Sequence, residues 1–565
     1  MLVSEIPYVR YDVNKIISAF FAAASILKVA RNRAEVEKIR AEVVKEEVDL
    51  DTAFNLAFIR WSINTADEFY TAEKAYYDEN LPKTYKAKNE YQEAFLAAVE
   101  KFGGNYPPSL LSVIKCKLIA ENEKIESEAA AENLLVGKYS DFMSALTVEY
   151  NGESLPVTVV KGYMSDGDRS VREKAYNALG ATLHKNADFL DESFDGLVKI
   201  RDKQAKILGF NNFTELSFYR RNRVGYGEAE LTALKNSIKK HVVPALSRIR
   251  KRIAENLGIQ NLKIFDISAV TESLPPKPCK QGEELLAQGE KMYSEMSEDT
   301  GKFFRFMLNN GAFDVLSKKN KWGGGYETDI SKYNQPFILA NFNGTSADAD
   351  VLTHEAGHAY ASYKASELNK DKELGLPFME VAETHSMSME FLCHKYIAEV
   401  FGADAEKYKF SHLVDSFTFI PYGAMVDEFQ KIVYDNPSLN PIERKKAWLK
   451  LESEYRPFFD NGGVTYFEDG GRWQYQMHIY EDPFYYIDYV IAGLTAMQFY
   501  VLSLEDYGAA FEKYRRFISY GADYDFSELI KKCGIPSPFV DENVKILTDK
   551  ITAVIDDFIS RGACK

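Results

Sequence analysis

One short segment of the chain carries residues that could hold a metal ion and activate water. It reads His354-Glu355-Ala356-Gly357-His358, the HExxH pattern. Residues four apart share a helix face and lie about 5 to 6 Å apart at Cβ, so His354 and His358 can bind one cation together. Glu355 lies about 100° round the helix and can reach a water molecule on that cation, where a general base would act. The spacing predicts a catalytic zinc site and metal-assisted hydrolysis.

The alternative is that both histidines are unrelated residues on a helix surface. The chain has only 8 histidines in 565 residues. At that frequency an accidental HExxH is expected about 0.01 times in this length, which disfavours the alternative.

A catalytic zinc site of this type needs a third protein ligand, and the following segment offers three carboxylates. MEVAETHSMSME contains Glu380, Glu383 and Glu390. These positions share roughly one helix face, so periodicity alone does not choose among them. A carboxylate that does not bind the metal would either orient a histidine, as we consider for Glu390, or be an ordinary surface group. Asp350, one turn before His354, is a similar candidate, with helix N-terminal capping as its alternative.

A second group of polar and aromatic residues follows in HIYEDPFYYIDY, with His478, Tyr485, Tyr486 and Tyr489. Peptide hydrolysis passes through a tetrahedral intermediate, and a tyrosine hydroxyl or an imidazole can donate to its oxyanion. Aromatic residues at helix ends are more often core residues, so this group alone does not establish a site.

Composition limits the class of protein. A chain of 565 residues exceeds one ordinary core and predicts two or more lobes. The net charge of -15 argues against nucleic acid as a partner. Five cysteines without CxxC spacing indicate a reducing compartment, and no uninterrupted apolar stretch is long enough to span a membrane. We therefore expect a cytoplasmic protein, of an oligomeric state that the sequence does not indicate.

The apolar segment Ile16 to Leu27 could be taken for a signal-peptide core, but acidic residues precede it and a charged helical pattern follows.

The first change of pattern along the chain follows a long helical region. From Asp12 to Ala130 it is nearly continuous helix. Two β-branched runs, TVEY and PVTVV, then flank Asn151-Gly152 and predict a hairpin. This break ends at residues 166–168 and divides the chain into an N-terminal helical region, 1–165, and a catalytic region, 166–565, whose lobes share helices.

A short strand is predicted from Pro336 to Gly344. Proline at its start is compatible with an edge strand, which could pair with an extended peptide, although a packed core strand fits nearly as well. The Gly-rich residues 323–325 before it are not followed by GKS or GKT, so they do not form a phosphate-binding loop.

Several segments together resemble peptidase family M3, in its oligoendopeptidase F branch. They are FILANFNGTSADADVLT before HEAGH, MEVAETHSMSMEFL, IPYGAMVDEFQ and GGRWQYQMHIYEDPFYYIDY, and weaker similarity extends over most of the chain. The resemblance implies a mainly α, two-lobed gluzincin metallopeptidase with a deep substrate cleft and a small β-sheet beside the HExxH helix. It also implies one zinc ion on His354, His358 and Glu383, with Glu355 as the general base.

The resemblance assigns further roles in the aromatic segment. The eleven-residue spacing from His478 to Tyr489 matches that of a histidine and a catalytic tyrosine in related gluzincins, so Tyr489 and zinc would stabilise the oxyanion. Tyr485 and Tyr486 become candidates for substrate contacts. Many relatives carry a cysteine where this chain has Tyr326-Glu327, so regulation through that thiol is not carried over.

These observations predict a zinc-dependent oligoendopeptidase that hydrolyses internal bonds of short unstructured peptides. One alternative is a metallocarboxypeptidase of a related helical fold, for which Arg472 is a candidate to hold the substrate's terminal carboxylate. A less favoured alternative is a non-catalytic peptide-binding protein.

Overall fold

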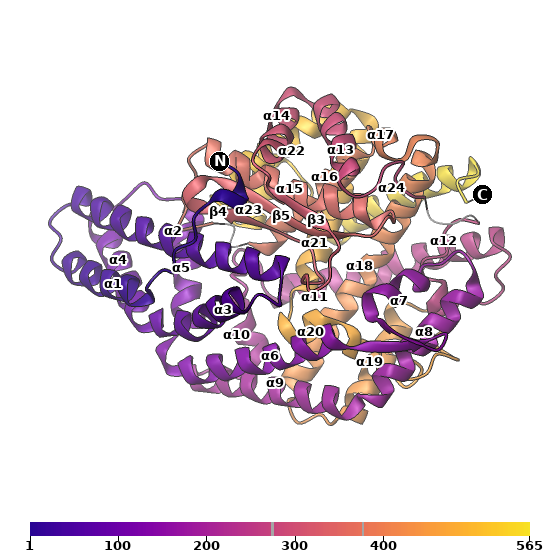
Figure 1. The fold of residues 1–565 in the computed structure, drawn as a ribbon, viewed down its shortest axis with the longest axis horizontal. Helices are drawn as coiled ribbons and strands as arrows, with labels where there is room; N and C mark the ends of the chain where they lie inside the picture. The colour runs from indigo at the N-terminus through magenta and orange to yellow at the C-terminus, as the bar shows by residue number, and fades with distance from the viewer. Residues whose placement is uncertain (273–275, 376–377, 565) are drawn as a thin grey trace.

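The protein folds into a mostly helical structure with two small β-sheets (Figure 1). The computed structural model describes residues 1–272, 276–375 and 378–564. In Figure 1 the N-terminal helices form one end of the molecule, and the larger sheet lies beside α15 in the upper half. The predicted mainly α fold, with a small sheet beside the HExxH helix, is confirmed.

The first part of the chain forms a series of helices. Their bounds are α1 Val13–Leu27, α2 Arg33–Ile63, α3 Glu68–Asn80, α4 Tyr85–Phe102, α5 Pro108–Ala120 and α6 Glu126–Ala145. The apolar face of α1, which includes Ile16, Phe20 and Leu27, is buried where α1 packs against α2 and α4. The apolar segment noted near the N-terminus is therefore part of a helical core.

A β-hairpin follows, but it is shorter than predicted. Strands β1 (Thr147–Tyr150) and β2 (Glu153–Pro156) pair around Asn151 and Gly152, whose φ values of 55° and 84° suit the two-residue turn. The PVTVV run does not continue the strand, because Pro156 ends β2 and Val157–Met164 forms helix α7. The prediction of a strand from the β-branched residues after Pro156 is therefore wrong.

The middle of the chain returns to helix. It comprises α8 Arg169–Lys185, α9 Ala187–Ile207, α10 Phe213–Arg220, α11 Glu228–Ser237, α12 Val243–Asn256, α13 Glu283–Met296 and α14 Glu298–Asn309.

The larger sheet has the strand order β3-β5-β4, with bounds Phe313–Leu316, Gln335–Phe342 and Tyr326–Ile330. The strand predicted from Pro336 is thus the central strand β5, so of the two alternatives the packed core strand is confirmed and the edge strand is not. Proline is tolerated because β3 pairs with β5 only from Ile338 onwards, so Pro336 has a neighbour on one side alone. The continuous burial of β5 fits its central position.

Helix α15 (Ala347–Glu367) carries the HExxH residues and begins directly after β5. The Asp348 carboxylate accepts hydrogen bonds from the backbone N–H groups of Asn343 and Gly344, at 2.9 and 2.7 Å. These bonds satisfy two backbone donors in the turn and fix the start of the helix against the sheet.

Helix α16 (Met379–Cys393) packs against α15 at very short range. A Cβ atom on Gly357 would lie 2.6 Å from the Cα of Ser386 and 2.9 Å from the carbonyl oxygen of His385. Backbone atoms cannot move aside as a flexible side chain can. Gly357 is therefore the residue that permits the two helices to touch.

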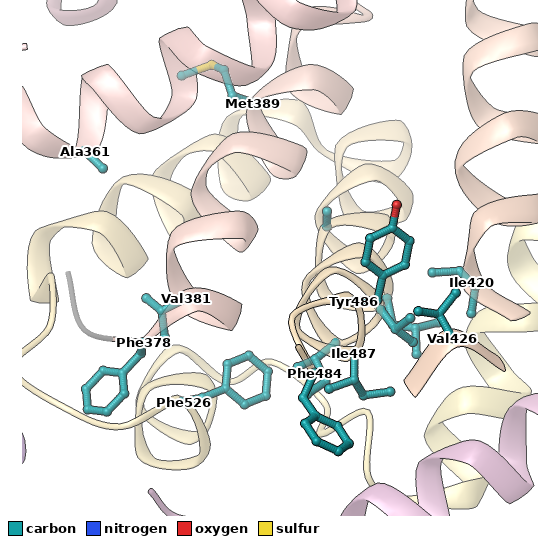
Figure 2. Packing of buried hydrophobic residues seen from close by; sticks show 14 of the residues in the cluster. Ala361, Phe378, Val381, Met389, Ile420, Val426, Phe484, Tyr486, Ile487 and Phe526 are labelled. Carbon is teal, nitrogen blue, oxygen red and sulfur yellow. The ribbon is translucent and has the colours of Figure 1, made fainter. Parts of the chain in front are cut away.

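The rest of the chain is also helical, and α21 and α22 pack on this pair. It forms α17 Ala398–Phe401, α18 Ala405–Asp435, α19 Pro441–Tyr455, α20 Met477–Glu481, α21 Tyr486–Glu505, α22 Tyr507–Tyr520, α23 Phe526–Cys533 and α24 Asp541–Ser560. Helix α21 packs on both α16 and α18. Figure 2 shows Tyr486 and Ile487 of α21 beside Ile420 and Val426 of α18.

Helix α21 is also apolar along its length. Within the described ranges it is the one helix long and apolar enough to cross a membrane, but 78% of its apolar window is buried inside the protein. Its burial against α16, α18 and α22 makes it a core helix of this fold.

A buried ion network connects α6 and α9 to the short helix α20. The Arg201 side chain, which is fully buried, donates to the Glu132 carboxylate at 2.6 Å and to the carbonyl oxygen of Tyr480 at 2.5 Å. Burial would raise the pKa of Glu132, but Arg220 and Arg201 hold it far below its usual range. The N-terminal helices thus contribute to the placement of α20, which carries His478.

The contact at Gly357 generates a prediction. Gly357→Ala should force α15 and α16 apart, lowering the free energy of unfolding by about 1 to 3 kcal/mol and weakening metal binding. Thermal denaturation and the zinc content after dialysis measure the two effects. Gly137→Ala in α6 is the matched control, because nothing lies within 4 Å of its added Cβ. The control should keep its stability or gain up to about 1 kcal/mol, and equal behaviour of both variants would contradict the role of Gly357.

Candidate active site

Three side chains converge where α15 meets α16. The Oε2 atom of Glu383 lies 3.2 Å from His354 Nε2 and 3.6 Å from His358 Nε2. The three ligand atoms lie within 4.8 Å of one another. The structure thus brings Glu383, rather than Glu380 or Glu390, to the Nε2 atoms of both histidines.

The spacing of these atoms fits a zinc ion. Nitrogen and oxygen ligands lie about 2.0 to 2.2 Å from tetrahedral zinc, which places two ligand atoms about 3.3 to 3.6 Å apart. Both Glu383 distances agree with that separation within about 0.1 Å. Burial would raise the pKa of Glu383, but the histidines hold it far below its usual range, so the carboxylate is ionised as a metal ligand must be.

Glu355 lies beside this cluster and is nearly buried, with 8% of its surface exposed. Loss of solvation raises the pKa of its carboxyl group, and His354 and His358 partly offset that effect. Gly325 lies directly before β4, and a Cβ atom on it would lie 3.7 Å from Glu355 Oε1. The general-base candidate therefore faces the end of the Gly-rich segment.

The remaining carboxylates have separate positions. Glu390 Oε1 lies 2.6 Å from His354 Nδ1, the ring nitrogen that faces away from Glu383. Asp350 accepts a hydrogen bond from the Tyr408 hydroxyl at 2.6 Å instead of contacting either histidine nitrogen. Glu380 lies near Asp488, and burial together with that carboxylate raises its pKa to about 8.

The aromatic segment reaches the same site from the start of α21. The Tyr485 hydroxyl donates a hydrogen bond to Oε1 of Glu383. The ring of His478 lies 5.0 Å from that of Tyr486 and 6.1 Å from that of Tyr489, between centroids. Burial raises the pKa of Tyr489 far above its usual value, so its hydroxyl stays protonated and can donate. All four residues named from the sequence lie together.

The backbone before these tyrosines is strained. Phe484 has a φ of 67°, which is costly for a bulky side chain. Its N–H donates to Gln430 Oε1 at 3.0 Å, and its carbonyl accepts from the buried Arg223 at 2.5 Å. Arg223 also bonds Asp488, as does Arg221 at 3.0 Å. These contacts hold the strained residue in place and thereby aim the tyrosines that follow it.

Sequence reasoning did not find the arginines, nor His412, whose Nε2 atom lies 2.7 Å from Glu390 Oε2. One signal was available in the composition. Histidine is rare in this chain, yet six of its 8 histidines fall between 354 and 478, namely His354, His358, His385, His394, His412 and His478. The arginines had no comparable signal, since Arg223 and Phe484 are 261 positions apart.

Comparison with known proteins places the chain among peptidases. The model of peptidase family M3 matches residues 162–548, and the model of the M3 N-terminal domain matches residues 3–118. The solved structure of Pz peptidase A with an inhibitor has a TM-score of 0.93 and is 35% identical, covering 98% of this chain and 99% of that one.

Curated relatives are more distant in sequence. The oligoendopeptidase F homolog of Mycoplasma pneumoniae is 22% identical over 71% of this chain and 68% of its own length. The chromosomal oligoendopeptidase F of Lactococcus lactis is 26% identical over 45% of this chain and 41% of its own length. Together these similarities confirm the resemblance inferred from the motifs.

The Tyr485 contact generates a prediction. Tyr485→Phe removes the hydroxyl that holds Oε1 of Glu383, so zinc affinity should fall by about tenfold, as for other groups that support a metal ligand. Competition with a chelator measures that affinity. Tyr486→Phe is the matched control, since it removes a neighbouring hydroxyl that no metal ligand contacts, and it should leave zinc affinity unchanged. A Tyr485→Phe enzyme with normal zinc affinity and only a raised KM would show that this hydroxyl serves the substrate instead.

Proposed function

The chain belongs to peptidase family M3, a family of metallo-oligopeptidases, and from that premise we propose that it is a zinc-dependent oligoendopeptidase. Its substrates would be short unstructured peptides, cleaved at internal bonds. The observation that carries the proposal is the convergence of His354, His358 and Glu383, with Glu383 at zinc-compatible distances from both histidines and Glu355 beside them.

A zinc ion held by these three residues would polarise the scissile carbonyl and lower the pKa of a water molecule. Glu355 would accept a proton from that water and later return it to the leaving amine. Its nearly buried position supports both transfers, because desolvation brings the pKa of a carboxylate closer to that of its proton partner.

Tyr489 would donate to the oxyanion of the tetrahedral intermediate, with His478 beside it. The hydroxyl is protonated and comes from a rigid helix, so little reorganisation is needed when charge develops. Tyr486, whose ring lies against that of His478, would contact the substrate. Tyr485 would contact the substrate too, and its hydrogen bond to Glu383 supports a second role in orienting that metal-ligand candidate.

We place the path of the substrate in a cleft between two lobes, close to the sheet. Because β5 is central, the strand that could pair with an extended peptide is the outer strand β4, which starts next to Glu355.

The carboxypeptidase alternative requires a free cation for the substrate's terminal carboxylate. Arg472, the candidate for that role, is already paired with Glu452 at 3.2 Å and lies over the Tyr422 ring. Its charge is therefore largely compensated within the protein, which favours the endopeptidase.

The test is the digestion of a peptide ladder whose members carry N-terminal or C-terminal blocks. The proposal expects internal cleavage of doubly blocked peptides, abolished by a chelator and restored by zinc. Glu355→Gln should bind zinc normally, and its turnover should fall by about 100- to 10,000-fold. Cleavage that needs a free C-terminus would identify a carboxypeptidase, and an active, zinc-loaded Glu355→Gln enzyme would remove Glu355 from its role. No cleavage by zinc-loaded wild-type protein would indicate a peptide-binding protein.

Tyr489→Phe tests the oxyanion assignment separately. Loss of one donor to an oxyanion costs about 100- to 1000-fold in kcat, whereas the ground state hardly uses it, so KM should change little. Steady-state kinetics on one blocked peptide separate the two constants. A variant in which KM rises while kcat holds would move Tyr489 to substrate binding.

A further inference from the structure

The carboxylate of Glu390 has two partners, and only one of them is a zinc-ligand candidate. Its Oε1 atom lies 2.6 Å from His354 Nδ1, and its Oε2 atom lies 2.7 Å from His412 Nε2. The other ring nitrogen of His412, Nδ1, lies 3.0 Å from His394 Nε2. A continuous series of hydrogen bonds thus runs from the metal-site histidine into the protein.

The series connects three helices in a buried setting. His354 comes from α15, Glu390 from α16 and His412 from α18, while His394 is the C-cap residue directly after α16. His412 is 8% exposed and His394 is 4% exposed. Aromatic rings enclose the far end, where Phe391 and Tyr408 lie 5.0 and 5.7 Å from the His412 ring, between centroids. A ring so enclosed has little freedom to turn away from Glu390.

The direction of the bonds follows from the groups at each end. With zinc held on its Nε2, His354 would donate its Nδ1–H to Glu390. Glu390 then accepts a second bond from His412 Nε2–H. His412 Nδ1 is left as an acceptor for His394 Nε2–H, and His394 Nδ1, which is buried without a partner, carries no proton. The reverse direction would bury an unmatched N–H donor, which is the more costly arrangement.

We propose that His412 is a positioning residue for the metal site, acting through Glu390 on His354. This inference rests on the proposed zinc function. His412 gives the second carboxylate oxygen a fixed donor, so Glu390 cannot rotate, and the orientation of the His354 ring and its basicity toward zinc are set. His412 touches neither the metal nor the substrate.

Other residues on the same face of α18 as His412 also contact the candidate site. Tyr408, one turn earlier, donates to Asp350 of α15, and Phe419, two turns later, lies 5.6 Å from Tyr486 and 6.1 Å from Tyr489, between ring centroids. One face of α18 therefore contacts Asp350 and Glu390 near the candidate metal site at one end, and the tyrosines of α21 at the other.

The test compares two substitutions of His412 in the full-length chain. His412→Phe keeps a ring but removes the donor to Glu390, so zinc affinity should fall by about tenfold, at the low end of the effect of outer partners of metal ligands. His412→Gln places an amide N–H near the former Nε2 and should recover most of that loss. Zinc affinity is measured by competition with a chelator, and the visible spectrum of the cobalt-substituted protein reports the ligand geometry.

The matched control is His241→Phe. His241 also bonds a carboxylate through Nε2, to Asp541 at 3.0 Å, but it lies outside the site. This variant should keep the zinc affinity and the cobalt spectrum of the wild type. Equal losses in the His241 and His412 variants would indicate a general effect on folding and overturn the inference.

Other outcomes are distinguishable. If the wild type itself fails to bind zinc, the proposed function falls. If the wild type binds zinc and a folded His412→Phe protein binds it equally well, or if His412→Gln is as weak as His412→Phe, only the inference on His412 falls. Should His412→Phe not fold, the ¹⁵N-histidine spectrum of the wild type decides. Zinc removal should shift the His412 N–H resonance, and an unshifted resonance would overturn the coupling.

Discussion

The contact between α15 and α16 at Gly357 is the constraint on which the candidate site depends. Both histidines lie on α15 and the carboxylate ligand candidate lies on α16. Their ligand atoms can meet within 4.8 Å only if the helix backbones approach to the distance that a missing Cβ allows. The glycine of HEAGH therefore permits the close contact between α15 and α16, which its position in the motif does not indicate. The spacing of the three ligand candidates follows from the packing of two helices, and it does not require a flexible loop.

The three carboxylates of α16 show how surroundings assign different states to one residue type. Burial alone would raise the pKa of all three. Histidine partners reverse that effect for Glu383 and for Glu390, whose pKa falls to about 2, whereas Glu380 has Asp488 beside it and its pKa rises to about 8. One helix thus presents two ionised groups to the histidines and keeps a third protonated at neutral pH. Because the three share a helix face, this distinction arises from residues on other helices and was not accessible from periodicity.

Sequence patterns predicted the features that depend on neighbouring residues. The HExxH helix, the turn at Asn151-Gly152 and the existence of the strand after Pro336 all follow from local spacing. The order of strands does not, because it depends on where β3 and β4 attach, and the sequence therefore left open whether β5 was an edge or a core strand. Partners such as His412 were missed because they too depend on contacts between distant segments. A hydrogen bond between residues 22 positions apart on different helices leaves no periodic trace.

The two halves of the candidate site are supported in different ways. On the metal side, close helix packing and the bonds of Glu390 restrict His354. On the aromatic side, a positive φ at Phe484 is held by Arg223 and Gln430, at a cost of about 1 to 3 kcal/mol in backbone strain. Such strain persists only where other contacts over-determine the conformation. Since Tyr485 follows directly and donates to Glu383, the strained turn also connects the halves. Preorganisation of the candidate donors and ligands therefore comes from buried residues around the candidate site.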